Sequence, residues 1–310
     1  MAALEEESAR LVQMAWAPRT LQMFEVGMSN FRRFRVAIQS PHANAPASPT
    51  EVKHFVAFLS LKKMSPSTIN SYVCAVSNWH KVQGLDDPCA DFLVRKALKG
   101  AARAGVSPDT RQPITPDLLL KLLTVLPIVC MSLYEAKMFT SVFTLAFFGL
   151  FRIGELVCQN KTFADKNALQ FQDVLFQNEL MKITIRFSKT DQLGRSNNII
   201  LQGDANSKLC PVKAMKDFIN FRGCHNGPMF CHFGKTFLSR YQFNRVLELS
   251  MKRADPSIKN VKSHSFRIGG ATNAICKGVP YEKVKEMGRW KSDAAKTYIR
   301  TPIIEVNVLT

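Results

Sequence analysis

The chain has 310 residues, enough for two domains that each bury a core. Apolar residues make up 46% and charged residues 21% of it, which is typical of a soluble globular protein and excludes a chain that is disordered throughout. Lysine and arginine outnumber aspartate and glutamate by 42 to 24, and the net charge of +18 favours a polyanionic partner, nucleic acid ahead of an anionic membrane.

The first residues and the apolar runs predict neither secretion nor a membrane span. Residues 1–10 contain three glutamates and lack the basic start and apolar stretch of a signal peptide. The longest apolar run, 142–151, is about half of the ~20 residues that a bilayer-spanning helix needs, so it predicts a buried helix. The eight cysteines are scattered, and we expect reduced thiols in a cytosolic or nuclear protein.

A helical domain is predicted for residues 17–103, behind a tail of residues 1–16. Apolar residues recur at helical spacing over 21–34. A break rich in proline and alanine at 46–50 precedes a second helix, for which Thr50 is the expected N-terminal cap.

Two more helices complete this predicted domain. Ser65 opens the third, and Gly84 lies just beyond its end. The fourth begins near Asp91 and carries a basic run that is either a solvated face or a surface that binds DNA phosphates. The residues of this run are Arg95, Lys96, Lys99 and Arg103.

A linker is predicted at 104–115, followed by a second domain at 116–310. The stretch 104–116 contains one glycine and three prolines, which is typical of an extended connection. Thr115 and Pro116 then start a helix, and a second apolar helix leads to Arg152.

Three runs in the second domain have the alternation of β-strands. They are 169–176, 181–187 and 198–201, and the last two flank a predicted hairpin loop at 188–197. From residue 211 onward the pattern is again helical.

The second domain also carries residues that suit chemistry on a phosphodiester. Its nonbridging oxygens gain charge in the transition state, and a planar guanidinium can bind two of them. Arg152 ends an apolar stretch, and Glu155 is spaced to orient it by an i,i+3 pair. Arg267 is the second candidate, and either arginine could instead form an ordinary surface ion pair.

His264 lies three residues before Arg267, so both side chains are expected on one helix face. A histidine beside a phosphate can donate a hydrogen bond or act as a base, although a histidine that caps a helix is an equally good interpretation of the isolated pair. Gly269 and Gly270 would let another element pack closely behind this helix.

The combined order of Arg152, Lys189, His264-x-x-Arg267, Trp290 and Tyr298 resembles the active site of the tyrosine recombinases, the family of phage integrases and Cre-like enzymes. The resemblance implies a mainly α protein with a small β-sheet or hairpin. It also implies an all-helical, SAM-like core-binding domain and a mixed α/β catalytic domain.

The resemblance assigns a role to each of these residues. Tyr298 is implied as the nucleophile that forms a 3′-phosphotyrosine, in preference to Tyr281, which precedes the tryptophan. Lys189 would protonate the leaving 5′ oxygen from the hairpin loop, although lysines in turns are often only solubilising, and Lys182 and Arg195 lie nearby. Trp290 would donate its indole N–H to the phosphate or simply pack in the core. Glu155 would support Arg152.

The same resemblance implies double-stranded DNA as partner, a homotetramer on paired sites with a dimer on each site, and no membrane, metal or cofactor. The segments 209–214 and 288–294 further resemble recombinases of eukaryotic mobile elements, the DIRS-like and crypton groups. A protein of that origin would act in a nucleus, and one of any other origin would be cytoplasmic. Cys224, His225, Cys231 and His232 do not have a common zinc-binding spacing.

Two other functions remain open from the sequence. The chain could be a non-catalytic DNA-binding protein derived from a mobile-element recombinase. A type IB-like topoisomerase shares the chemistry, although the predicted helical domain and the compact size favour recombination.

Overall fold

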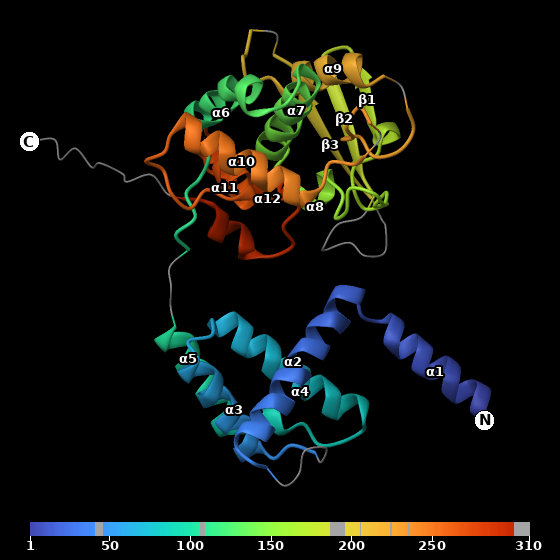
Figure 1. The fold of residues 1–310 in the computed structure, drawn as a ribbon, viewed down its shortest axis with the longest axis vertical. Coiled ribbons are helices and arrows are strands. Elements are labelled where there is room, and N and C mark those ends of the chain that lie inside the picture. The colour runs from blue at the N-terminus through green and yellow to red at the C-terminus, as the bar shows by residue number, and fades with distance from the viewer. Residues whose placement is uncertain are drawn as a thin grey trace, which may run out of the picture. The chain divides into compact units, whose positions relative to one another are not determined.

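The computed structural model describes residues 1–40, 46–105, 109–186, 196–204, 206–223, 225–234 and 236–300. The chain divides into two units, Met1–Asp109 and Thr110–Thr310, each with its own apolar core (Figure 1). The first unit is helical and the second combines helices with a small antiparallel sheet, which confirms the predicted fold class. The division lies within the range 104–115 where the sequence indicates a linker.

The first unit packs its helices around phenylalanine side chains. Its elements are α1 (Ala2–Met14), α2 (Pro18–Ala37), α3 (Pro49–Leu61), α4 (Pro66–Val82), the 3-10 helix η1 (Pro88–Ala90) and α5 (Phe92–Ala104). The rings of Phe31 and Phe34 lie 5.1 and 5.3 Å from that of Phe55 and join α2 to α3. Helix α1 contains no buried residue, so the predicted tail is an exposed helix.

Local side-chain caps fix the starts of three of these helices. The expectation of Thr50 as a cap is wrong, because Ser48 accepts a hydrogen bond from the backbone N of Glu51 at 3.2 Å and Glu51 accepts one from the backbone N of Ser48 at 3.4 Å. This capping box satisfies two free N–H groups at once, whereas Thr50 lies inside the first turn. Ser65 and Asp91 cap α4 and α5, which begin where the sequence predicts them to begin.

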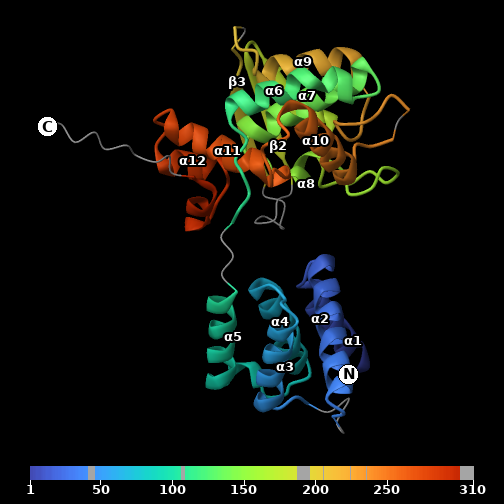
Figure 2. The ribbon, with the colours of Figure 1, turned by 60° about the vertical axis from the view of Figure 1, so that its left-hand side comes forward.

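The second unit has α7 at its centre, with α9 and α11 packed on it (Figures 1 and 2). Its helices are α6 (Pro116–Val129), α7 (Leu133–Phe148), α8 (Ile153–Leu156), α9 (Pro211–Arg222), α10 (Arg240–Ala254), α11 (Ser263–Cys276), α12 (Tyr281–Met287) and the 3-10 helices η2 (Phe171–Asp173) and η3 (Asp293–Tyr298). Ten residues of α7 are buried, so the apolar run near 142–151 is a core helix as predicted. No helix in the described part of the chain is both long and apolar enough to cross a bilayer.

The sheet consists of β1 (Val174–Gln177), β2 (Leu180–Ile185) and β3 (Asn197–Gln202), antiparallel in that order. Met181 lies opposite Leu201, and the inward residues of β2 are buried. The prediction of a strand over 169–176 is wrong for its first part. Asp173 accepts a hydrogen bond from the backbone N of Gln170 at 3.0 Å, which turns the chain into η2 before β1 begins. Residue 187 of the second predicted strand and residues 188–195 of the predicted hairpin loop lie outside the described residues.

Helix α11 passes unusually close to two neighbouring backbone segments. A Cβ atom on Gly269 would lie 1.8 Å from the carbonyl oxygen of Ile114, and one on Gly270 would lie 2.1 Å from that of Phe147. Because backbone oxygens cannot move aside cheaply, only glycine allows this approach. The approach places the second turn of α11 beside the end of α7.

We therefore expect Gly269→Ala to destabilise the second unit by about 3 kcal/mol or more, since overpacking against backbone is hard to relieve. The measurement is urea unfolding followed by circular dichroism. Gly154→Ala, in α8, is the control, because a Cβ there would meet nothing within 4 Å. Equal stabilities of the two variants would contradict this account of the close contact.

Candidate active site

The turn that follows α7 positions Arg152. Its backbone N donates to Glu155 Oε2 at 2.9 Å, and its Nη1 donates to Glu155 Oε1 at 3.0 Å. The Glu155 side chain is 5% exposed and that of Arg152 is 19% exposed. The i,i+3 pair that the spacing indicates is therefore present, and it leaves part of the guanidinium open to a ligand.

Arg267 is buried completely and joins two backbone turns. Its Nη1 donates to the carbonyl oxygen of Leu150, and its Nη2 donates to that of Gly288. The guanidinium carbon lies 4.2 Å from the Trp290 ring centroid and 5.5 Å from that of Tyr298. Burial, followed by the charge of Arg152, lowers the pKa of Arg267 to about 9, so the group is still a cation at neutral pH.

His264 and Tyr298 are in direct contact. The Nε2 atom of His264 lies 2.8 Å from the hydroxyl oxygen of Tyr298, and the two ring centroids are 5.2 Å apart. Burial, and then the charges of Arg111 and Arg267, lower the pKa of His264 to about 4. A neutral imidazole with its proton on Nδ1 accepts the phenol proton at Nε2.

This low pKa predicts a pH-dependent contribution of His264 to stability. Because its pKa falls from 6.5 to about 4 on folding, the unfolded chain binds the proton more tightly between these pH values. The contribution of His264 to the free energy of unfolding should be fully present above about pH 6.5 and should decline toward pH 4. We expect the melting temperature of His264→Gln to depend less on pH over this window than that of the wild type. The control His225→Gln, at an exposed histidine, should keep the pH dependence of the wild type. An equally steep dependence in His264→Gln would contradict the assignment.

Trp290 is both a core residue and an available donor. Its side chain packs in a small cluster with Leu150 and Ala271 and lies 5.0 Å, between ring centroids, from Tyr298. A Cβ on Gly288 would lie 1.8 Å from the indole ring, so glycine is required there. The Nε1 atom is buried and has no hydrogen-bond partner among the described residues. The two interpretations that the sequence left open are therefore compatible.

The structure thus brings six of the predicted residues together from the turn after α7, α8, α11, the turn after α12 and η3. They are Arg152, Glu155, His264, Arg267, Trp290 and Tyr298. Lys189 and Arg195 lie outside the described residues. Lys182 lies on the exposed face of β2 opposite Ile200. Tyr281 lies at the start of α12, with a buried hydroxyl that has no partner within the described ranges.

Four basic residues of the first unit lie on α5. Arg95, Lys96, Lys99 and Arg103 are all exposed. The ammonium group of Lys96 lies 4.9 Å from the ring centroid of Phe92, which is itself exposed. This arrangement leaves the positive charges of α5 open to solvent.

The cysteines and histidines do not form a metal site in the part of the chain that is described, where no group of ligands could hold an ion. His232 Nδ1 lies 3.0 Å from Glu135 Oε1, and Cys224 lies outside the described residues. The seven described cysteines are free thiols.

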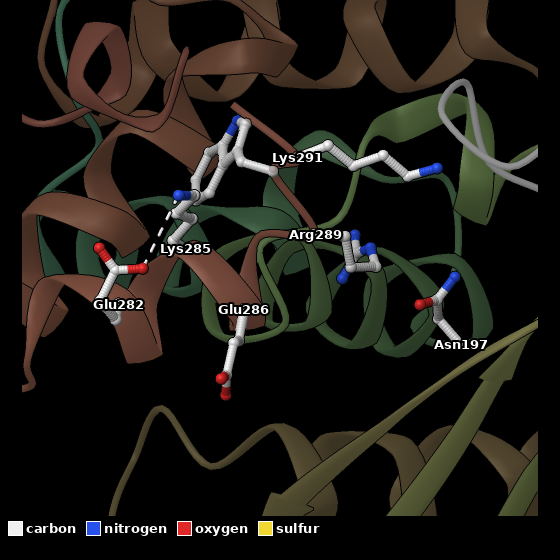
Figure 3. A pocket seen from close by; sticks show the side chains of 7 residues that line it. Asn197, Glu282, Lys285, Glu286, Arg289 and Lys291 are labelled. Atoms are coloured by element: carbon white, nitrogen blue, oxygen red, sulfur yellow. Dashed lines mark ion pairs between the residues drawn. The ribbon is translucent and has the colours of Figure 1, made fainter. Parts of the chain in front are cut away.

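Arg289 is a site residue that the sequence analysis missed. Its side chain is 7% exposed and forms an ion pair of 2.8 Å with Glu155. It lines a pocket with Asn197, Lys285 and Lys291, in which Lys285 pairs with Glu282 (Figure 3). The available signal was its place between Gly288 and Trp290, which any basic surface residue could also occupy.

No family model matches the sequence. The integrase/recombinase xerD homolog of Selenomonas ruminantium is 25% identical over 305 residues, which is 94% of this chain and 83% of that protein. Among solved structures, a lambda integrase dimer bound to a COC′ core site has 16% identity and a TM-score of 0.65, covering 98% of this chain and 79% of that one. The Tn1549 transposon integrase in complex with transposon right end DNA has 14% identity and a TM-score of 0.60, covering 96% and 94%.

The fold is therefore that of the tyrosine recombinases. The chain is also similar, over nearly its whole length, to an integrase/recombinase.

Proposed function

We propose that the protein is a site-specific DNA recombinase or integrase that cleaves and rejoins DNA through a 3′-phosphotyrosine intermediate. The observation that carries this proposal is the 2.8 Å contact between the Tyr298 hydroxyl and His264 Nε2 beside the guanidinium of Arg267. A phenol is a weak nucleophile at neutral pH, and it needs a neighbouring base and cations to react.

In the proposed reaction, His264 takes the phenol proton as the Tyr298 oxygen attacks the scissile phosphorus. The new bond joins phosphorus to the tyrosine oxygen, and the bond to the 5′ oxygen breaks. Lys189 supplies the proton that this oxygen needs to leave as a hydroxyl. The 5′ hydroxyl of a partner duplex then attacks the phosphotyrosine, so the ester is exchanged and no nucleotide cofactor is required.

Three groups stabilise the charge of the pentacoordinate phosphate in this proposal. Arg152 reaches the nonbridging oxygens from its open side, and the unpartnered Nε1 of Trp290 donates to one of them. Arg267 lies beneath the ring of Tyr298, so the turn of this ring toward the phosphate uncovers the guanidinium. Glu155 orients Arg152 throughout.

Double-stranded DNA is the proposed partner. The exposed residues Arg95, Lys96, Lys99 and Arg103 would bind phosphates from α5, with an affinity that falls steeply with salt. We propose a dimer on each site and a homotetramer on paired sites. The narrower affinity to eukaryotic mobile-element recombinases, and with it a nuclear rather than cytoplasmic location, rests on Trp290 and the segments 209–214 and 288–294 alone.

Covalent trapping tests this function. The protein is incubated with nicked duplexes from a site library, in which the released fragment diffuses away, and denaturing gels then reveal protein–DNA adducts. We expect an adduct with the wild type and none with Tyr298→Phe. Salt-sensitive binding without any adduct would shift the interpretation to a non-catalytic DNA-binding protein. Relaxation of supercoiled DNA without strand exchange would favour a topoisomerase.

A further inference from the structure

Arg289 is a buried cation that the proposed chemistry does not use. It follows the end of α12, has a backbone φ of 56°, and exposes only 7% of its side chain. A guanidinium that is withdrawn from water destabilises the fold unless its N–H groups have acceptors. The acceptors of Arg289 therefore indicate what the residue holds in place.

Four acceptors take the four Nη hydrogens of Arg289. Its Nη2 donates to Glu155 Oε2 at 2.8 Å and to the carbonyl oxygen of Leu150 at 3.1 Å. Its Nη1 donates to the carbonyl oxygens of Met287 at 3.1 Å and of Gly149 at 3.3 Å. One guanidinium thus closes the turn after α12 and fastens it to the turn after α7.

Glu155 lies between two guanidinium groups. Its Oε1 accepts from Arg152 Nη1 at 3.0 Å, and its Oε2 accepts from Arg289 Nη2 at 2.8 Å. The Glu155 side chain is 5% exposed, so water cannot take the place of either partner. Arg289 therefore fixes the direction of the carboxylate, and the carboxylate fixes Arg152.

The same guanidinium also supports the other half of the site. The Leu150 carbonyl oxygen accepts from both Arg289 and Arg267, and Leu150 has a φ of 48°, which a residue with a side chain rarely adopts. Arg267 in turn donates to the carbonyl oxygen of Gly288, which precedes Arg289 and Trp290. Two buried arginines thus hold one pair of strained turns together.

We propose that Arg289 is a positioning residue for strand cleavage, an inference that rests on the function proposed above. It holds Arg152 through Glu155 and holds Trp290 and Tyr298 through the turn after α12, so that both halves of the site face the same phosphate. Its four Nη hydrogens are all engaged, and its fifth donor, Nε, is buried and has no partner among the described residues, so Arg289 presents no accessible N–H group to a phosphate.

The first test is the rate of adduct formation on nicked duplexes. A displacement of about 1 Å can cost roughly 100-fold in rate, and we expect a loss of this size in Arg289→Gln. DNA affinity should change by less than about twofold, because only 7% of the side chain is exposed. Arg289→Lys should stay impaired, since an ammonium group lacks the planar set of donors that meets four acceptors. It also serves as the second variant if Arg289→Gln does not fold.

Lys283→Gln is the matched control for the loss of a positive charge. Lys283 lies on α12 with 65% of its side chain exposed and pairs with Glu286, three residues further along the helix. We expect its adduct rate to equal that of the wild type. Wild-type rates in both Arg289 variants would overturn the inference.

A double-mutant comparison separates positioning from general loosening of the unit. If Arg289 acts largely through Arg152, then Arg289→Gln should lower the rate of adduct formation by less than about 10-fold in an Arg152→Ala background. This loss is far smaller than the one expected in the wild-type background. The same fold-loss in both backgrounds would overturn the route through Arg152.

Hydrogen exchange of the DNA-free protein gives a readout that needs no activity. In Arg289→Gln, the amides of residues 149–157 should exchange faster, although they lie far from the substitution in sequence, and those of α5 should not change. Unchanged exchange in 149–157 would overturn the inference even if the enzyme is active. Faster exchange without any wild-type adduct would reject the proposed recombination and retain the role of Arg289 in the fold.

Discussion

Replacing Tyr298 with phenylalanine should abolish covalent attachment to DNA, with a loss of at least about 10³-fold in adduct formation. Phenylalanine keeps the ring that packs 5.0 Å from Trp290 and lies over Arg267, and it removes only the hydroxyl that contacts His264. The fold and the DNA affinity should therefore be nearly unchanged. The measurements are adduct yield on nicked duplexes and binding by fluorescence anisotropy.

Two other tyrosines provide controls for this result. Tyr241 is 76% exposed on α10, and Tyr281 has a buried hydroxyl on α12. We expect both phenylalanine variants to form adducts at the wild-type rate. An adduct with Tyr298→Phe, or its loss in Tyr281→Phe alone, would contradict the assignment of the nucleophile.

A mixing experiment tests whether Tyr298 serves its own active site. Tyr298 contacts His264 and Arg267 of the same chain, so we expect each protomer to cleave with its own tyrosine. A mixture of Tyr298→Phe and Arg152→Ala proteins contains no protomer with both residues. The mixture should therefore stay inactive, whereas recovery of cleavage would show that the tyrosine acts on a neighbour's site.

Removing the guanidinium of Arg152 should slow adduct formation by about 10²–10³-fold, or roughly 3–4 kcal/mol of barrier. The phosphate would lose a cation whose side chain is 19% exposed and therefore accessible to DNA. Arg152→Lys should fall between the wild type and Arg152→Ala, because lysine keeps the charge and loses the two-pronged geometry.

The fold should tolerate Arg152→Ala, because Glu155 keeps its 2.8 Å ion pair with Arg289. We expect a change of only about 1 kcal/mol in the free energy of unfolding. Arg245→Ala is the control, since Arg245 is an arginine of α10 with 51% of its side chain exposed. A wild-type cleavage rate in Arg152→Ala would refute its proposed role.

The helices were predictable where short-range signals are strong. Ser65 and Asp91 cap α4 and α5 because a side-chain oxygen reaches an N–H group only two or three residues away. Thr50 was predicted as the cap of α3, but Ser48 is the cap. Ser48 and Glu51 exchange two hydrogen bonds between side chain and backbone, which satisfies two N–H groups at once. The strand predicted at 169–176 begins at Val174, since the contact between Gln170 and Asp173 turns the backbone first.

The candidate site was predictable as a set of residues and less so as a geometry. The order from Arg152 to Tyr298 indicated the family, and the pair of Arg152 with Glu155 followed from their spacing. The burial of Arg267 beneath Trp290 and Tyr298 did not follow, because no local pattern distinguishes a buried arginine from an exposed one.

Periodicity and caps depend on residues within a turn or two of one another, so the sequence alone was sufficient for most helices. The order of the motifs from Arg152 to Tyr298 was sufficient for the fold class. The role of Arg289 depends on Glu155, 134 residues earlier, and on backbone carbonyl groups of the turn after α7. Every residue has a backbone carbonyl group, so these acceptors leave no signal in the sequence. The close passage of α11 at Gly270, beside Phe147 and Leu150, and the hydrogen bonds of Arg267 to Leu150 and Gly288 bring these segments together in the folded chain. The tertiary structure therefore decided which of these cations stays partly exposed, as Arg152 does, and which is buried and held by acceptors, as Arg289 is.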